Sequence, residues 1–139
     1  MLNIVTRELT GLLQAREGAP KMDLTAVRGI ALHHTGFTGD VPNAVADPAS
    51  YMQVLQAFYL DMRGYSDVAY NFVINASGQV LEGRGLRYRC AANGTNESNL
   101  AYPAVLFPGD FRAGGNQLTA AQIGAFRQLR AFLLGLQSK

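Results

Sequence analysis

Two adjacent histidines, His33 and His34, have the clearest potential for chemistry in this chain, and they are its only histidines. They end the short apolar run 29–32, and Thr35 and Gly36 follow at once. An apolar run bounded by a turn signal predicts a buried β-strand, which places both imidazoles where a sheet meets solvent. Imidazoles in such a place can bind a metal or act as a catalytic base, and adjacent ones on a strand point to opposite faces. Ordinary strand-end histidines bonded to the backbone remain an equal alternative.

The composition favours a compact globular protein. With 139 residues, 48% hydrophobic and 16% charged, the chain suits one domain with its own core and is unlike a disordered chain. A net charge of +2 without any Lys/Arg run argues against nucleic acid as a partner and suits an anionic polymer. Cys90 is the only cysteine, so no internal disulfide can form. The sequence has no segment of membrane-spanning length and no secretory signal, which predicts a protein made in the cytoplasm without a signal peptide.

Hydrophobic periodicity predicts the elements that position the histidines. Helices are expected over 2–15, 47–64 and 118–137, strands over 29–33, 68–74, 79–81 and 101–107, and loops over 37–48 and 90–99. Asn75-Ala76-Ser77-Gly78 predicts a hairpin, and Thr119 is the expected N-cap of the last helix. The inward-facing residues are expected to be Met52, Leu55, Phe58, Tyr59 and Met62 in one helix and Ile123, Phe126, Leu129, Leu133 and Leu136 in the other.

The predicted fold class is α/β, with a mixed central β-sheet flanked by helices in a single domain, 1–139. Residues 1–27 would form an N-terminal helix and connector, and 28–139 the core. Strand 29–33 is expected at the centre of the sheet, paired with strands 68–74 and 101–107, because nearly continuous apolar runs are typical of strands covered on both faces. Helix 118–137 should cross one face of this sheet.

Three segments in sequence order resemble one family. They are Leu32-His33-His34-Thr35, the stretch 65–74 that contains Tyr70-Asn71-Phe72, and the stretch 78–85 that ends in Glu82-Gly83-Arg84-Gly85. They resemble the peptidoglycan recognition proteins and the related zinc N-acetylmuramoyl-L-alanine amidases (type 2 amidases), which include phage endolysins. The similarity runs from about residue 29 to the C-terminus and takes in 94–96, 108–111 and 118–122.

The resemblance implies an amidase that hydrolyses the amide between N-acetylmuramic acid and L-alanine and so lyses bacterial cell walls. It implies zinc as cofactor, with His33 as a metal ligand, and Tyr70 as the catalytic residue that orients water or stabilises the oxyanion. Peptidoglycan and its muropeptides would be the partners. The polar groups implied to bind them in the groove are His34, Thr35, Asn71, Arg84 and Asn96.

Two side chains near this groove keep alternative interpretations. Arg84 could pair with a stem-peptide carboxylate or lock the turn by bonding backbone carbonyls. Glu82 is interpreted as a partner of Arg84 or of a loop amide in preference to a catalytic base.

The chain also departs from the family pattern. The second and third zinc ligands normally follow the last long helix, where this sequence reaches 138–139 without a third histidine. Ala91 stands where the family has an active-site histidine, and Leu106 where some relatives have a catalytic glutamate. Since a catalytic zinc needs about three protein ligands, weak or absent zinc binding is expected. The alternatives are a non-catalytic peptidoglycan-binding module with a degenerate zinc site, or an interaction protein that reuses the scaffold.

Overall fold

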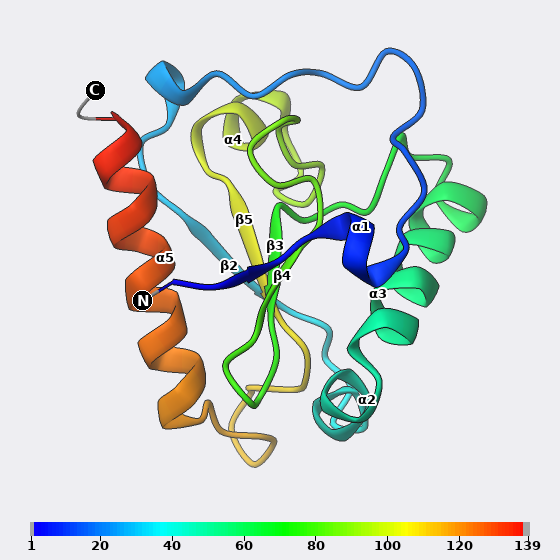
Figure 1. Ribbon diagram of the computed structural model, residues 1–139, viewed down its shortest axis with the longest axis vertical. Helices are drawn as coiled ribbons and strands as arrows, with labels where there is room; N and C mark the ends of the chain where they lie inside the picture. Colours follow the sequence, from blue (N-terminus) through cyan, green and yellow to red (C-terminus); the bar gives the residue numbers. More distant parts are fainter. Residues whose placement is uncertain (1, 138–139) are drawn as a thin grey trace.

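A mixed sheet with helices on both faces organises the computed structural model, which describes residues 2–137 (Figure 1). The five strands are β1 (Ile4–Val5), β2 (Ala31–His34), β3 (Phe72–Ile74), β4 (Val80–Glu82) and β5 (Ala104–Phe107), in the spatial order β1-β4-β3-β5-β2. Only β3 and β4 pair antiparallel. The helices are α1 (Arg7–Thr10), α2 (Asp40–Ala46), α3 (Pro48–Ala57), α4 (Asn96–Ala101) and α5 (Ala120–Gln137), with a 3-10 turn η1 (Leu24–Ala26) and a π-helical turn η2 (Phe58–Met62). The predicted α/β class is confirmed.

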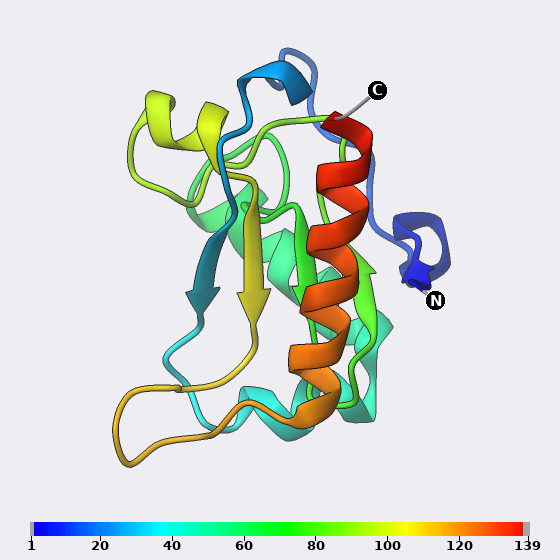
Figure 2. The ribbon, with the colours of Figure 1, turned by 90° about the vertical axis from the view of Figure 1, so that its left-hand side faces the viewer.

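Successive side chains along each strand point to opposite faces of the sheet, so the core has two layers. Val73, Leu81 and Leu106 face α3, where Met52 is fully buried among them. Their strand neighbours, such as Phe72 and Val105, face α5, and Leu129 and Leu133 complete that layer. Figure 2 shows α5 crossing one face of the sheet while α2 and α3 lie behind it. The prediction that this helix covers one face is therefore confirmed.

The predicted central position of the histidine strand is wrong. Strand β2 lies at the edge and pairs only with β5 among the described strands, and Leu32 is 54% exposed. Strand β3 has two sides, one taken by its hairpin partner β4 and the other by β5. No side of β3 is left for β2, so the predicted pairing of these two strands is wrong as well. The hairpin itself is confirmed.

The predicted N-terminal helix over 2–15 is also wrong. Ile4 and Val5 instead pair with Val80 and Leu81 and add a strand to the sheet. The helix that follows has four residues, because Thr6 caps it at the Leu9 amide and Gly11, with φ of 78°, ends it. A helix this short cannot bury a stripe, and Leu9 and Leu13 are exposed. Both predicted loops hold a helix: α2 lies within 37–48, and α4 begins at residue 96 within 90–99.

The two long helices follow their predicted stripes in part. Met52, Leu129 and Leu133 are buried as expected, whereas Phe58, Met62 and Ile123 are exposed. The π-helical turn after α3 shifts the side-chain register, which explains the first two of these exposed residues. No helix among residues 2–137 has the length and apolar character needed to cross a membrane.

The start of α5 contains a reciprocal cap. The Gln122 amide donates to Thr119 Oγ1 over 3.0 Å, and the Thr119 amide donates to Gln122 Oε1 over 3.0 Å. Thr119 is thus confirmed as the N-cap. Gln122 also donates through Nε2 to the Ile74 carbonyl over 3.1 Å, which ties the helix to β3.

Candidate functional site

The structure brings His33 and Tyr70 together on the face of the sheet that α3 covers. His33 lies beside Leu106 in the parallel pairing of β2 with β5, so its ring points to the same side as that core residue. Tyr70 lies two residues before β3, and the two ring centroids are 5.7 Å apart with the planes tilted by 58°. An imidazole and a phenol from separate segments therefore meet on one face of the sheet.

The Tyr70 phenol is buried and neutral. Only 8% of the residue is exposed, and its hydroxyl lies 3.0 Å from the Tyr59 hydroxyl. Burial, reinforced by this hydrogen bond, raises the pKa of Tyr70 far above its ordinary value. Tyr59 is held in turn by Tyr65, whose ring stacks on it at 5.4 Å. A neutral phenol in this place can donate a hydrogen bond without losing its proton at physiological pH.

His33 has a partner that sequence reasoning missed. Its Nε2 lies 2.6 Å from Oδ1 of Asn93, in the loop before α4. The amide group of Asn93 is fixed by the carbonyls of Tyr102 and Ser98, to which Nδ2 donates over 2.7 and 3.0 Å. In the sequence, Asn93-Gly94 signals a turn and nothing more, and no spacing connects residue 93 to residue 33.

His34 faces away from this pair, and both His34 and Thr35 fasten the end of β2 to the turn after β5. The Phe111 amide donates to His34 Nδ1 over 3.1 Å, and Thr35 Oγ1 both donates to the Gly109 carbonyl (3.2 Å) and accepts from its amide (3.0 Å). The two imidazoles thus lie on opposite faces of the sheet, as expected, and each has its own hydrogen-bond partner. A hollow of about 290 Å³ opens beside His34 and Phe111.

Asp110 adds a charge near His34. Arg112 donates to its two carboxylate oxygens over 2.8 Å each, and these hydrogen bonds lower the pKa of Asp110 to about 2. His34 Nδ1 lies 3.8 Å from the same carboxylate, but this contact is an ion pair only when the imidazole is protonated. Because Nδ1 already accepts the Phe111 amide, the neutral imidazole is the form that matches the geometry.

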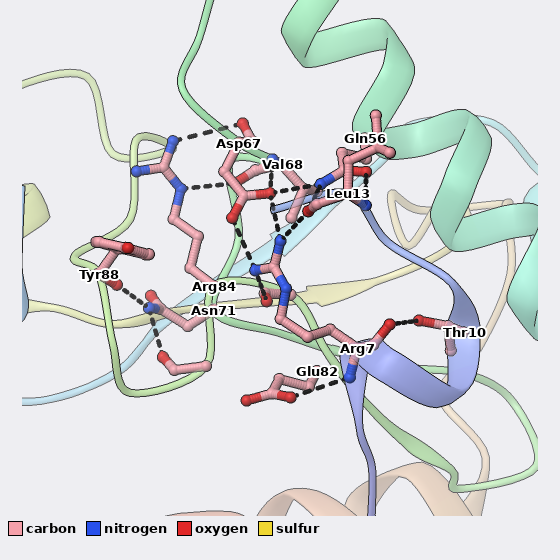
Figure 3. Close-up of polar contacts among 12 residues, drawn as sticks. Arg7, Thr10, Leu13, Gln56, Asp67, Val68, Asn71, Glu82, Arg84 and Tyr88 are labelled. Atoms are coloured by element: carbon pink, nitrogen blue, oxygen red, sulfur yellow. Dashed lines mark hydrogen bonds and ion pairs between the residues drawn. The ribbon is translucent and has the colours of Figure 1, made fainter. Parts of the chain in front are cut away.

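The groove roles predicted for Asn71 and Arg84 are contradicted, because both side chains hold the backbone together. Asn71 is fully buried and donates to the Gly85 and Tyr88 carbonyls over 2.9 Å each (Figure 3). It also accepts from the Ala104 amide over 2.9 Å. No lone pair or proton of this amide faces a groove.

Arg84 is 3% exposed and follows the second of its two interpretations. It donates to the carbonyls of Val68 (2.6 Å) and Asp67 (3.4 Å), as Figure 3 shows, and to that of Arg89 (2.9 Å), so it locks the turn. Burial lowers the pKa of its guanidinium below the ordinary value. Glu82 accepts from the backbone amide of Arg7 over 3.0 Å, in agreement with its interpretation as the partner of an amide.

A hollow of about 430 Å³ lies along α2 and α3. Its lining combines carboxylates, an amide and a hydroxyl with aromatic and aliphatic groups: Asp40, Asn43, Asp47, Ser50, Tyr51, Val54, Leu55 and Phe58. Tyr51 and Leu55 also pack against the core cluster that contains Tyr70. The Tyr51 hydroxyl donates to Asp40 over 3.3 Å, and burial together with this carboxylate raises the pKa of the phenol. Such a lining suits a ligand with both apolar surface and many hydrogen-bonding groups.

Known proteins are similar to this chain in sequence and in fold. Peptidoglycan-recognition protein SC2 of Drosophila melanogaster is 35% identical over 98 residues, which cover 70% of this chain and 50% of the relative. The N-acetylmuramoyl-L-alanine amidase of Sus scrofa is 35% identical over 68 residues, 49% of this chain and 11% of that protein. The structure of human PGRP-IBETAC in complex with glycosamyl muramyl pentapeptide superposes with a TM-score of 0.79 at 25% identity, covering 96% of this chain and 76% of the other. No family model matches the chain.

The chain belongs to the family of peptidoglycan-recognition proteins and related amidases. It spans about half the length of the first of these curated relatives. The resemblance expected from the histidine, tyrosine and glycine motifs is therefore confirmed.

The zinc site associated with the amidases in this family does not fit the side chains described here. Within residues 2–137, no group of three or more His, Cys, Asp or Glu side chains is placed to hold a metal. His33 is engaged at Nε2 by Asn93, and Ala91 and Leu106 supply no ligand atoms. Cys90 is 2% exposed, and burial raises the pKa of its thiol, which disfavours the thiolate that zinc requires. Weak or absent zinc binding stays a prediction, and the stretch 138–139 lies outside the described residues.

The predicted role of Asn96 in binding a ligand stays a prediction. It is exposed at the first position of α4, where Thr95 caps the helix at the Ser98 amide over 3.1 Å. Its amide group is therefore accessible to a ligand that reaches this helix.

Proposed function

We propose that this domain binds muropeptides, on the face of the sheet where His33 and Tyr70 meet and along the hollow on α2 and α3. The observation that carries the proposal is the contact between that imidazole and that phenol in a member of the peptidoglycan-recognition family. A net charge of +2 agrees with an anionic polymer as partner. The human relative solved with a muramyl pentapeptide offers a precedent for the ligand class.

The hollow on α2 and α3 supplies complementary chemistry for such a ligand. A muropeptide carries sugar hydroxyls, acetamido groups and peptide amides beside the apolar faces of its sugar rings and methyl groups. Asp40 and Asn43 can accept or donate hydrogen bonds to the former, and Leu55 and the half-exposed Phe58 can cover the latter. Tyr70, as a neutral phenol, can donate to a ligand carbonyl when it exchanges its contact with Tyr59.

Hydrolysis of the amide between N-acetylmuramic acid and L-alanine is the second candidate function. The pairing of His33 with Tyr70 favours it, since a phenol beside an imidazole can stabilise an oxyanion at a cleaved amide. If the domain hydrolyses this amide, we propose that it depends on zinc and degrades the cell wall. Its setting would then be that of a phage endolysin, made in the cytoplasm and acting on the bacterial wall. Recognition without hydrolysis ranks first, because the described residues offer no three-ligand metal group.

Isothermal titration of the purified chain with a muramyl pentapeptide, beside chitotetraose as a sugar without peptide, tests the first proposal. We expect saturable binding of the muropeptide and much weaker binding of chitotetraose. Phe58→Ala should weaken binding, whereas Phe132→Ala, a similarly exposed phenylalanine on α5, should not. Absence of saturable binding, or equal effects of the two substitutions, would overturn the proposal. Release of stem peptide from purified wall, with and without added zinc, tests the second.

A further inference from the structure

The orientation of the Asn93 amide is determined by its surroundings. Its Nδ2 has two protons and two carbonyl acceptors within reach, those of Tyr102 (2.7 Å) and Ser98 (3.0 Å), with Cys90 Sγ at 3.4 Å. A flipped amide would set Oδ1 against these acceptors and lose both hydrogen bonds. Oδ1 must therefore face His33, where it can only accept.

This orientation decides where the neutral imidazole of His33 carries its proton. Nε2 lies 2.6 Å from an atom that only accepts, so Nε2 is the protonated nitrogen and Nδ1 keeps the lone pair. Among the described residues, Nδ1 has no hydrogen-bond partner, and no buried polar side-chain atom there lacks one, so Nδ1 is in contact with solvent. The ring thus offers a single accessible acceptor atom.

We infer that Asn93 is a positioning residue, which holds His33 in the Nε2–H form and presents Nδ1 to an N–H donor of the ligand. The inference rests on the proposed function, in which the donor is a peptide amide of a muropeptide. It adds a residue outside the recognised motifs to the site, and it assigns one nitrogen of the imidazole to the ligand.

The loop that carries Asn93 is itself fastened. The backbone N–H of Asn93 donates to Asn99 Oδ1 over 2.9 Å. Tyr102, whose carbonyl accepts the hydrogen bond from Asn93 Nδ2, directly follows α4. Thr95 caps this helix at Ser98. Helix α4 therefore holds the asparagine in place, and movement of its side chain would break the contacts with Ser98 inside the helix and with Tyr102 at its C-terminal end.

Two-bond ¹H–¹⁵N correlation spectra of the imidazoles, recorded where both are neutral, test the assignment directly. The chain has two histidines, and His34 serves as an internal reference because its Nδ1 accepts the Phe111 amide independently of Asn93. We expect pure Nε2–H for His33 with slow exchange of that proton. Asn93→Ala should give mixed tautomers and fast exchange at His33 alone, and Glu97→Ala, an exposed residue of the same helix, should change neither ring. Nδ1–H at His33 in the parent chain would overturn the inference, whatever the variants do.

Titration with a muramyl tripeptide tests the positioning role. Asn93→Ala should weaken binding about tenfold, the scale of one well-formed hydrogen bond, and should add no further loss in a His33→Ala background. A changed tautomer with unchanged affinity, or a full additional loss in the double variant, would overturn the role. If the parent chain bound no muropeptide, the proposed function would fail, and the spectra alone would still decide whether Asn93 fixes the tautomer.

Discussion

The buried ion pair between Arg7 and Asp67 should be the strongest single anchor of the N-terminal segment. Arg7 donates to both carboxylate oxygens, over 2.7 and 3.3 Å, and to the carbonyls of Gly83 (2.7 Å) and Leu13 (2.6 Å) (Figure 3). The Arg7 side chain is 13% exposed and that of Asp67 is 0% exposed. Arg7→Met keeps much of the aliphatic packing and removes all four donated bonds.

The magnitude follows from what remains around the carboxylate. Asp67 would keep the Gln56 side chain (2.9 Å), the Val68 amide (2.8 Å) and the electrostatic attraction of Arg84, but it would lose Arg7, the one side chain that forms an ion pair with it in the described structure. Removing one partner of a buried pair typically costs about 3–5 kcal/mol, because the other charge stays buried without compensation. With an unfolding entropy of about 2 cal/mol/K per residue, this loss lowers Tm by about 10–17 °C.

Urea denaturation and calorimetry of Arg7→Met, beside Arg16→Met, measure the effect. Arg16 pairs with Asp61 at 3.9 Å, and the two side chains are 52% and 73% exposed, so its removal should cost less than about 1 kcal/mol. Asp67→Asn in the Arg7→Met chain should recover part of the stability, because a neutral amide needs less compensation. Equal effects of the two arginine substitutions would refute the reasoning.

Three side chains at or beside the candidate site give further outcomes. Asn71→Ala should lower the free energy of unfolding in urea by about 3 kcal/mol, since two buried backbone groups and a partly buried one lose their partner; an unchanged midpoint would contradict the scaffold role. The Asp110 carboxyl should titrate near pH 2 by NMR and move toward 3.8 in Arg112→Ala. Its folded pKa is depressed, so its contribution to stability is present above about pH 4 and is lost as the pH falls through 2. Tyr70→Phe should keep the fold and reduce any wall hydrolysis roughly a hundredfold; equal rates would rule out its catalytic role.

Local signals in the sequence predicted the elements that local interactions build. The hairpin rests on 75–78, where Gly78 takes φ of 83°, and the start of α5 rests on the pairing of Thr119 with Gln122. Sheet order depends instead on partners far apart in the chain. No pattern in the first residues predicts that Ile4 pairs with Val80. The apolar run of β2 resembles that of a central strand, although β2 lies at the edge of the sheet.

The same distinction between local signals and distant contacts holds for the candidate site. His33 and Tyr70 were predicted through motifs, and the structure places their rings in contact. Asn93 was missed because its contact with His33 depends on how the loop before α4 returns to the sheet, which no spacing encodes. Asn71 and Arg84 were assigned to the groove because polar residues in a binding motif suggest contact with a ligand, yet both are buried in backbone contacts.

These two misassigned residues explain what the motif does physically. The amides of Gly83 and Gly85 both donate to the Asn71 carbonyl over 2.9 Å, and the Arg84 amide donates to the Tyr70 carbonyl over 2.9 Å. A Cβ at Gly83 would lie 2.3 Å from the Tyr70 carbonyl oxygen, so only glycine allows the turn to approach so closely. The turn after β4 and the segment before β3 therefore form one rigid unit that fixes the position of Tyr70 beside His33. Residues of this motif can be indispensable to the site without touching a ligand, because what they position is the phenol.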